Sequence, residues 1–118
     1  MITNLAFVAY PTRDARASRD FYETVLGLSL THSWKDVWFE YDLGDATFVI
    51  AKADDEHPTP ARGAMVAFEV ADLDETVSRL ESKGVALEKG ITTTPVCRMA
   101  VVVDPDGNEL ILHQRTAA

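Results

Sequence analysis

Cysteine is almost absent from this chain of 118 residues, because Cys97 is the only one. A single cysteine excludes an intrachain disulfide and favours a reducing compartment. Long hydrophobic runs are absent too, since no stretch approaches the ~20 apolar residues that a membrane-spanning helix needs. The apolar N-terminal segment carries no basic leading residues and no small-residue cleavage site, so we expect no signal peptide. These absences predict a cytoplasmic protein without a membrane partner.

Basic residues are also scarce. Eleven Lys and Arg residues stand against nineteen Asp and Glu residues, which gives a formal net charge of −8. Such a surface repels phosphate backbones, and no basic stripe offsets it. We therefore expect no nucleic-acid partner and interpret the acidity chiefly as a contribution to solubility.

Motifs of several catalytic classes are missing. The three histidines, His32, His57 and His113, show none of the close spacings of paired metal ligands. No serine lies in a glycine-flanked turn between a strand and a helix, and no phosphate-binding glycine loop is present. The sequence thus gives no local signature of a metalloenzyme, a serine hydrolase or a nucleotide-binding protein.

The chain does contain an internal repeat of the order strand, helix, strand, strand, strand. Asp14 and Asp72 are expected to cap the two helices, and Gly27 and Gly84 to end them. The expected apolar stripes of the two helices are Ala17, Phe21 and Val25, and Leu73, Val77 and Leu80. The expected strands are residues 5–10, 28–32, 37–43 and 46–53 in the first half, and 64–70, 85–88, 96–103 and 109–114 in the second.

The spacing of these signals supports a duplication. Asp14 and Asp72 are 58 positions apart, and Gly27 and Gly84 are 57 apart. Two βαβββ modules of this kind are an α+β pattern. We assign module one to residues 1–53, a linker to residues 54–63 and module two to residues 64–118. Because 47% of the residues are apolar, we expect all 118 residues to form one domain.

Three motifs point to a known family, and with the repeat they cover nearly the whole chain. They are Asp14 with Phe21-Tyr22-x-x-x-Leu26-Gly27, then Glu69-Val70-Ala71-Asp72-Leu73-Asp74, and finally Asp104-Pro105-Asp106-Gly107-Asn108. In this order and spacing the chain resembles the vicinal oxygen chelate superfamily. This group includes glyoxalase I, extradiol dioxygenases, fosfomycin-resistance proteins and bleomycin-binding proteins.

The resemblance implies two modules whose curved mixed sheets enclose a cavity, which dimerisation often completes. We therefore expect a homodimer. In enzymes of the superfamily, histidine, glutamate or glutamine side chains from four strands project into the cavity. At least three of them typically hold a divalent metal, which acts as a Lewis acid on the substrate.

In this chain the four corresponding positions are occupied by Phe7, Val49, Met65 and Ile111. None of these side chains offers the imidazole or carboxylate that a hard or borderline divalent cation requires. We therefore expect no metal and no other cofactor. Four apolar replacements instead predict an apolar cavity that suits a small organic ligand.

Several other side chains are candidates for contact with that ligand. His113 follows Ile111 by two residues, so the period of a strand puts both on one face. His113 could exchange protons near neutral pH, or it could be an ordinary histidine at a sheet edge. One of Cys97 and Arg98 should share this face, and the sequence leaves open which one. Trp38 could form a stacking wall or pack in the core.

Three functional hypotheses follow. The leading one is a metal-independent binder of a small organic molecule, which acts by sequestration or sensing. The alternative is a lyase, isomerase or dioxygenase of the superfamily that uses Cys97, His113 and Arg98 or an unrecognised metal site. The third is a structural dimerisation module, which would bind no ligand.

Overall fold

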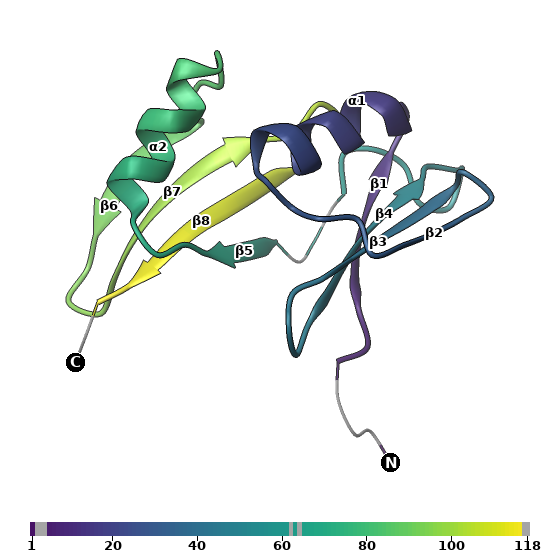
Figure 1. The fold of residues 1–118 in the computed structure, drawn as a ribbon, viewed down its shortest axis with the longest axis horizontal. Coiled ribbons are helices and arrows are strands. Elements are labelled where there is room, and N and C mark those ends of the chain that lie inside the picture. Colours follow the sequence, from purple (N-terminus) through teal and green to yellow (C-terminus); the bar gives the residue numbers. More distant parts are fainter. Residues whose placement is uncertain (2–4, 62, 64, 117–118) are drawn as a thin grey trace. The chain divides into compact units, whose positions relative to one another are not determined.

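The computed structural model describes residues 1, 5–61, 63 and 65–116. Its contacts divide the chain into two compact units. Unit 1 is Met1–Arg62 with Pro105–Asn108, and unit 2 is Gly63–Asp104 with Glu109–Ala118. Each unit holds one four-stranded mixed sheet (Figure 1), so the predicted α+β fold of two βαβββ modules is confirmed. Residues 2–4 of the apolar N-terminal segment, Arg62 of the linker and Ala64, the expected start of the fifth strand, lie outside the described residues.

Unit 1 has the strand order β1-β4-β3-β2, in which β1 pairs with β4 in parallel and the other pairs are antiparallel. Its elements are β1 (Val8–Thr12), α1 (Ala15–Arg19), η1 (Asp20–Val25), β2 (His32–Trp34), β3 (Trp38–Asp42) and β4 (Thr47–Lys52). Strand β1 continues through Pro11, where the sequence predicted its end. Proline is tolerated there because β1 is at the edge of the sheet and pairs only with β4.

The helical segment of unit 1 begins where it was predicted. The side chain of Asp14 accepts a hydrogen bond of 3.1 Å from the backbone N–H of Ala17. After five residues the α-helix passes into the π-helix η1. The wider turn changes the buried face, so Ser18 and Tyr22 are buried together with Phe21. The predicted stripe of Ala17, Phe21 and Val25 is therefore only partly correct.

The two faces of the unit 1 sheet differ in composition. Phe39, Tyr41, Phe48 and Ile50 are buried in the core, where the ring centroids of Tyr22 and Phe48 lie 4.9 Å apart. We call the opposite side open face 1. The strand register assigns to it the side chains of Ala9, Pro11, Trp38, Glu40, Val49 and Ala51.

Unit 2 repeats this arrangement with the strand order β5-β8-β7-β6. Its elements are β5 (Val66–Glu69), α2 (Leu73–Ser82), β6 (Lys89–Thr93), β7 (Cys97–Val103) and β8 (Glu109–Arg115). Helix α2 lies against β7 and β8 (Figure 1). Asp72 caps it by accepting a hydrogen bond of 3.1 Å from the Glu75 N–H. Its predicted apolar stripe of Leu73, Val77 and Leu80 is buried.

The side of the unit 2 sheet opposite α2 is called open face 2. Ladder pairing assigns to it Ala67, Glu69, Met99, Val101, Ile111 and His113. The two halves also correspond residue by residue. Ala9 pairs with Val49 in unit 1, and Ala67 pairs with Ile111 in unit 2, in the same parallel register. The internal repeat is thus present in the hydrogen-bond ladders as well as in the order of elements.

Two strands lie later in the chain than the sequence predicted. We expected strands at residues 28–32 and 85–88, whereas β2 is His32–Trp34 and β6 is Lys89–Thr93. Each of these strands is at the end of its sheet and pairs with a single neighbour. Its position is therefore set by that neighbour, and β6 also contains an irregularity in register between Lys89 and Thr92. In the part of the chain that the structure describes, no helix is long and apolar enough to cross a membrane.

Candidate functional site

A cavity of about 900 Å³ lies against open face 1. The sheet contributes apolar side chains from β1, β3 and β4, and the segment after β4 forms the other wall. The lining residues are Phe7, Ala9, Tyr10, Pro11, Val37, Trp38, residues 51–54, residues 56–58, Pro60 and Ala61. All of them belong to unit 1. The volume is within the range of small-molecule sites in proteins.

The aromatic wall of this cavity is formed by Phe7 and Trp38, two of the residues that the sequence predicted. Their rings meet edge to face, with centroids 5.1 Å apart and an interplanar angle of 89°. The Trp38 indole N–H donates a hydrogen bond of 2.7 Å to Oε2 of Glu40, which fixes the orientation of the indole. Phe7 is 47% exposed although it is large and apolar. The pair thus presents aromatic surface at the cavity.

The second wall comes from the segment that the sequence assigned only as a linker. Oδ1 of Asp54 accepts hydrogen bonds from the backbone N–H groups of Glu56 and His57, at 3.0 and 2.7 Å. The His57 backbone N–H is the main reason why the pKa of Asp54 is lowered. Further on, the Ala61 N–H donates to Oδ1 of Asn108 at 2.6 Å. Sequence reasoning missed this wall, although the prolines at 58 and 60 were a signal of an ordered, stiff segment.

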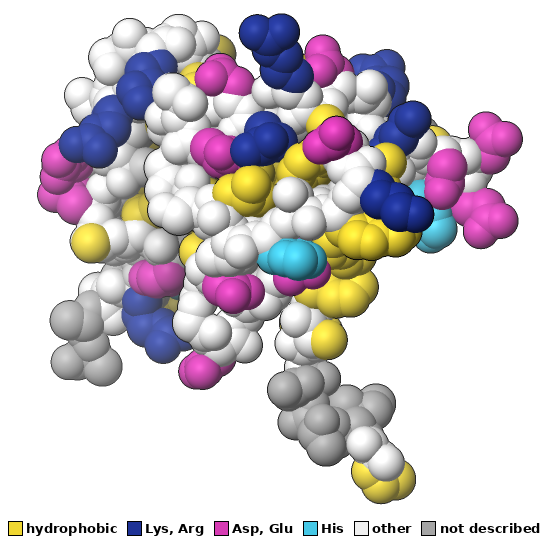
Figure 2. Space-filling model, turned by 45° about the vertical axis from the view of Figure 1, so that its right-hand side comes forward, with side chains coloured by type: hydrophobic (Ala, Val, Ile, Leu, Met, Phe, Trp, Pro, Cys, Tyr) yellow, Lys and Arg dark blue, Asp and Glu magenta, His cyan; other side chains and the backbone are white. Residues whose placement is uncertain are grey.

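The charged groups at this cavity are few and of mixed sign. Lys52 is a lining cation, and Asp54 and Glu56 are lining carboxylates. Figure 2 shows hydrophobic side chains gathered on the surface beside acidic, basic and histidine side chains. The residues that line this cavity favour neutral or cationic ligands with apolar surface over polyanions.

At the four positions that hold the metal in related enzymes, this chain has side chains that do not suit a metal ion. Phe7 and Val49 are in unit 1, and Met65 and Ile111 are in unit 2. Their side chains carry no nitrogen or oxygen ligand. Within the described residues there is also no group of three or more His, Cys, Asp or Glu side chains that could hold a metal ion. We derive no metal-dependent chemical step.

Val49 needs a correction within unit 1. Its ladder position is on open face 1, but the side chain is fully buried and does not line the cavity. The reason is its place on β4, which has a paired strand on each side. In unit 2, Met65 is 47% exposed and Ile111 is half-buried.

The structure also decides between Cys97 and Arg98. Met99 pairs with His113, and side chains alternate between the two faces along β7. Cys97 is therefore on the same face of the sheet as His113, and Arg98 is on the opposite face. Arg98 donates two hydrogen bonds of 2.9 Å to Asp74 of α2 and is therefore not on open face 2. Cys97 is buried, with its sulfur 3.3 Å from Oγ1 of Thr94. The proposed trio of Cys97, His113 and Arg98 is not brought together.

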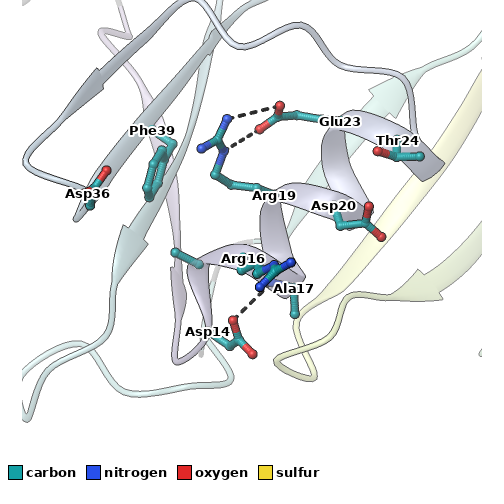
Figure 3. A pocket seen from close by; sticks show the side chains of 10 residues that line it. Asp14, Arg16, Ala17, Arg19, Asp20, Glu23, Thr24, Asp36 and Phe39 are labelled. Carbon is teal, nitrogen blue, oxygen red and sulfur yellow. Dashed lines mark hydrogen bonds and ion pairs between the residues drawn. The ribbon is translucent and has the colours of Figure 1, made fainter.

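A second cavity of unit 1, of about 700 Å³, lies beside α1 and η1 (Figure 3). Arg19 donates to both carboxylate oxygens of Glu23, at 2.7 and 3.3 Å, and its guanidinium is 5.0 Å from the centre of the Phe39 ring. The Tyr41 hydroxyl donates to Oε2 of Glu23 at 2.9 Å. The Arg19 hydrogen bond is the main cause that lowers the pKa of Glu23, whereas burial is the main cause that raises the pKa of Tyr41. These groups satisfy one another, so we assign them a structural role.

Comparison with known proteins agrees with this architecture. The sequence matches the family model of the Glyoxalase/Bleomycin resistance protein/Dioxygenase superfamily over residues 4–112, and the chain therefore belongs to this superfamily. No curated protein matches the chain significantly.

Solved structures give closer points of comparison. TnmS3, an antibiotic binding protein from Streptomyces sp. CB03234, is 27% identical, with 98% of each chain covered and a TM-score of 0.82. A glyoxalase/bleomycin resistance protein from the same organism is 26% identical, with 97% of this chain and 100% of that chain covered and a TM-score of 0.74. Lactoylglutathione lyase from Agrobacterium tumefaciens, at 21% identity, 96% and 94% coverage and a TM-score of 0.74, shares the fold.

Proposed function

We propose that this protein binds a small organic molecule without a metal ion, in the cavity on open face 1, and acts by sequestration or sensing. The observation that carries the proposal is the Phe7–Trp38 pair, which presents aromatic surface at a cavity of about 900 Å³. Aromatic walls with few polar groups suit a planar aromatic or amphipathic ligand better than a sugar or a phosphate ester.

Two further observations support this function. The four positions of the expected metal site are apolar in this chain. The structure at 27% identity and a TM-score of 0.82 is described as an antibiotic binding protein. The enzymatic alternative has no comparable support, because Arg98 pairs with Asp74 and is on the opposite side of the sheet from His113.

Tryptophan fluorescence tests the proposal. The chain has two tryptophans, of which Trp38 lines the cavity and Trp34 does not. We would titrate Trp34→Phe and Trp38→Phe variants with a panel of planar aromatic and amphipathic antibiotics. A ligand in the cavity should quench the fluorescence of Trp34→Phe, in which Trp38 is the emitter, more than that of Trp38→Phe, in which the emitter is Trp34 on the neighbouring strand.

Affinity provides the second measurement. Trp38→Ala should weaken any ligand found in the panel at least about tenfold, as loss of a buried aromatic anchor does. Arg98→Lys is the control and should change affinity less than about twofold. The proposal would be contradicted if no compound in the panel bound, or if a bound ligand kept its affinity for Trp38→Ala.

We also propose that the protein is a homodimer in a reducing, cytoplasmic compartment. Leu5 and Trp34 are 71% and 55% exposed, and a dimer interface that covered them would remove apolar surface from water. A specific dimer should bury more than ~1,000 Å². Light scattering at micromolar concentration should give twice the mass of the chain, and a monomer there would count against this part of the proposal.

A further inference from the structure

A histidine and a glutamate form a hydrogen-bonded pair on open face 2. Glu69 of β5 and His113 of β8 are ladder partners, and Nδ1 of His113 is 2.6 Å from Oε1 of Glu69. The other carboxylate oxygen, Oε2, accepts the backbone N–H of Arg115 at 2.7 Å. The backbone of His113 is held as well, because its carbonyl accepts the Val70 N–H at 2.8 Å. Both side chains are therefore fixed in orientation.

The hydrogen bonds determine which nitrogen of the imidazole carries the proton. The backbone N–H of Arg115, and after it the His113 ring, lower the pKa of the Glu69 carboxyl. An ionised carboxylate has no proton to give, so Nδ1 of His113 is the donor. In the neutral ring Nε2 is then a hydrogen-bond acceptor. It has no hydrogen-bond partner among the described residues, and the side chain is 25% exposed.

The surroundings of His113 on this face are largely apolar. Met99 is its ladder partner on β7, and Ile111 precedes it by two residues on the same strand. Besides Glu69, this face carries Arg115 at the end of β8, which is exposed. An oriented acceptor beside apolar side chains favours a ligand that has a hydroxyl over one that lacks it.

We propose that His113 and Glu69 form a binding site for a weakly acidic hydroxyl, a phenol or an enol, whose O–H donates to Nε2 of His113. Glu69 is a positioning residue that holds the acceptor tautomer of the ring. This site is in unit 2 and goes beyond the function proposed above, which concerns the cavity of unit 1. A purely structural pair would use the same Nδ1–H to fasten the end strand β5 to β8, so the two roles differ in whether Nε2 accepts a hydroxyl from a ligand.

Glu69→Gln separates the two roles because the Arg115 N–H decides how the amide is oriented. That N–H needs an acceptor, so the amide oxygen takes the place of Oε2 and the NH₂ group points at His113. The NH₂ group then donates to Nδ1, which moves the ring proton to Nε2. The hydrogen bond between the strands is kept, but the open nitrogen becomes a donor.

Nitrogen-15 NMR of the ligand-free full chain is the first test. At neutral pH, the neutral imidazole of His113 should carry its proton on Nδ1 in the unmodified protein and on Nε2 in Glu69→Gln. Glu88→Gln, a change at an exposed glutamate, should leave the tautomer unchanged. A proton on Nε2 in the unmodified protein would overturn the proposal.

The second test compares two probes, 4-methylphenol, which keeps its O–H at neutral pH, and its methyl ether 4-methylanisole, by NMR titration followed at the backbone amide of residue 113. The unmodified protein and Glu88→Gln should bind the phenol about tenfold more tightly than the ether, the effect of one hydrogen bond. Glu69→Gln and His113→Leu should lose this preference. Equal binding of both probes, or a preference that survives Glu69→Gln, would refute the site. Failure of the unit 1 cavity would show separately, in the fluorescence of Trp38.

Discussion

The hydroxyl of Thr12 donates a hydrogen bond of 2.5 Å to Oδ2 of Asp106, which is 94 positions further along the chain. The other oxygen of Asp106 accepts the backbone N–H of Arg13 at 2.7 Å, and Thr12 Oγ1 accepts the N–H of Asp14 at 3.2 Å. Thr12 and Asp106 are both buried. Through these bonds the turn Pro105–Asn108 belongs to unit 1, although the strands on either side of it belong to unit 2.

Asp106→Ala should therefore lower the free energy of unfolding by about 2–4 kcal/mol, because it leaves the Thr12 hydroxyl and the Arg13 N–H without their acceptor. Urea denaturation followed by circular dichroism measures the change. Asp55→Ala removes an exposed carboxylate and should change stability by less than about 0.5 kcal/mol. Equal effects of the two substitutions would show that the buried network is not stabilising.

Ser18→Ala should stabilise the protein. The Ser18 hydroxyl is buried, and it is the one buried polar side-chain atom without a hydrogen-bond partner in the described part of the chain. Its removal should raise the free energy of unfolding by up to about 1–2 kcal/mol. Ser78→Ala, at an exposed position in α2, corrects for the higher helix propensity of alanine. A gain at position 18 no larger than that at position 78 would contradict the prediction.

Glu23 should give a stability contribution that depends on pH. Its pKa is lowered from 4.5, first by the hydrogen bond from Arg19. The folded state thus favours the carboxylate, so this contribution is complete above pH 4.5 and is lost as the pH falls through the lowered pKa. Because the Arg19 and Glu23 side chains are 38% and 27% exposed, the contribution should stay below about 1 kcal/mol.

The measurement for this prediction compares Glu23→Gln with the unmodified protein in urea between neutral and acidic pH. The difference in unfolding free energy should be largest near neutral pH and should shrink below pH 4.5. Glu75→Gln is the matched control, since Glu75 and Arg79 form a longer pair of 3.7 Å with both side chains about two-thirds exposed. A difference in unfolding free energy that grew as the pH fell would contradict the prediction.

Protein purified without a chelator should contain no stoichiometric divalent metal. Phe7, Val49, Met65 and Ile111 offer no charge to offset the dehydration of Zn²⁺ or Mn²⁺. Elemental analysis by mass spectrometry should find much less than one ion per chain, and a chelator should leave the melting temperature unchanged. One tightly held ion per chain, with a thermal shift on chelation, would refute this prediction and the metal-independent function together.

Local signals in the sequence determined much of the secondary structure of this protein. The caps Asp14 and Asp72 and the terminating residues Gly27 and Gly84 act within one helical turn, so their effect is visible without a partner. The apolar stripe of α2 and the alternation in β3 likewise follow from the fixed periods of helix and strand. These signals occur once in each half of the sequence, and they were sufficient to predict two βαβββ modules.

Only the tertiary structure decided the features that depend on distant partners. The pairing of Met99 with His113 put Arg98 on the side of α2, where Asp74 holds it, and left Cys97 on the side of His113. The partner of His113 is Glu69, 44 residues away. The segment after β4 became a cavity wall through hydrogen bonds to its own backbone and to Asn108. The physical reason is strand register, because a shift of one residue moves every side chain of a strand to the other face of the sheet.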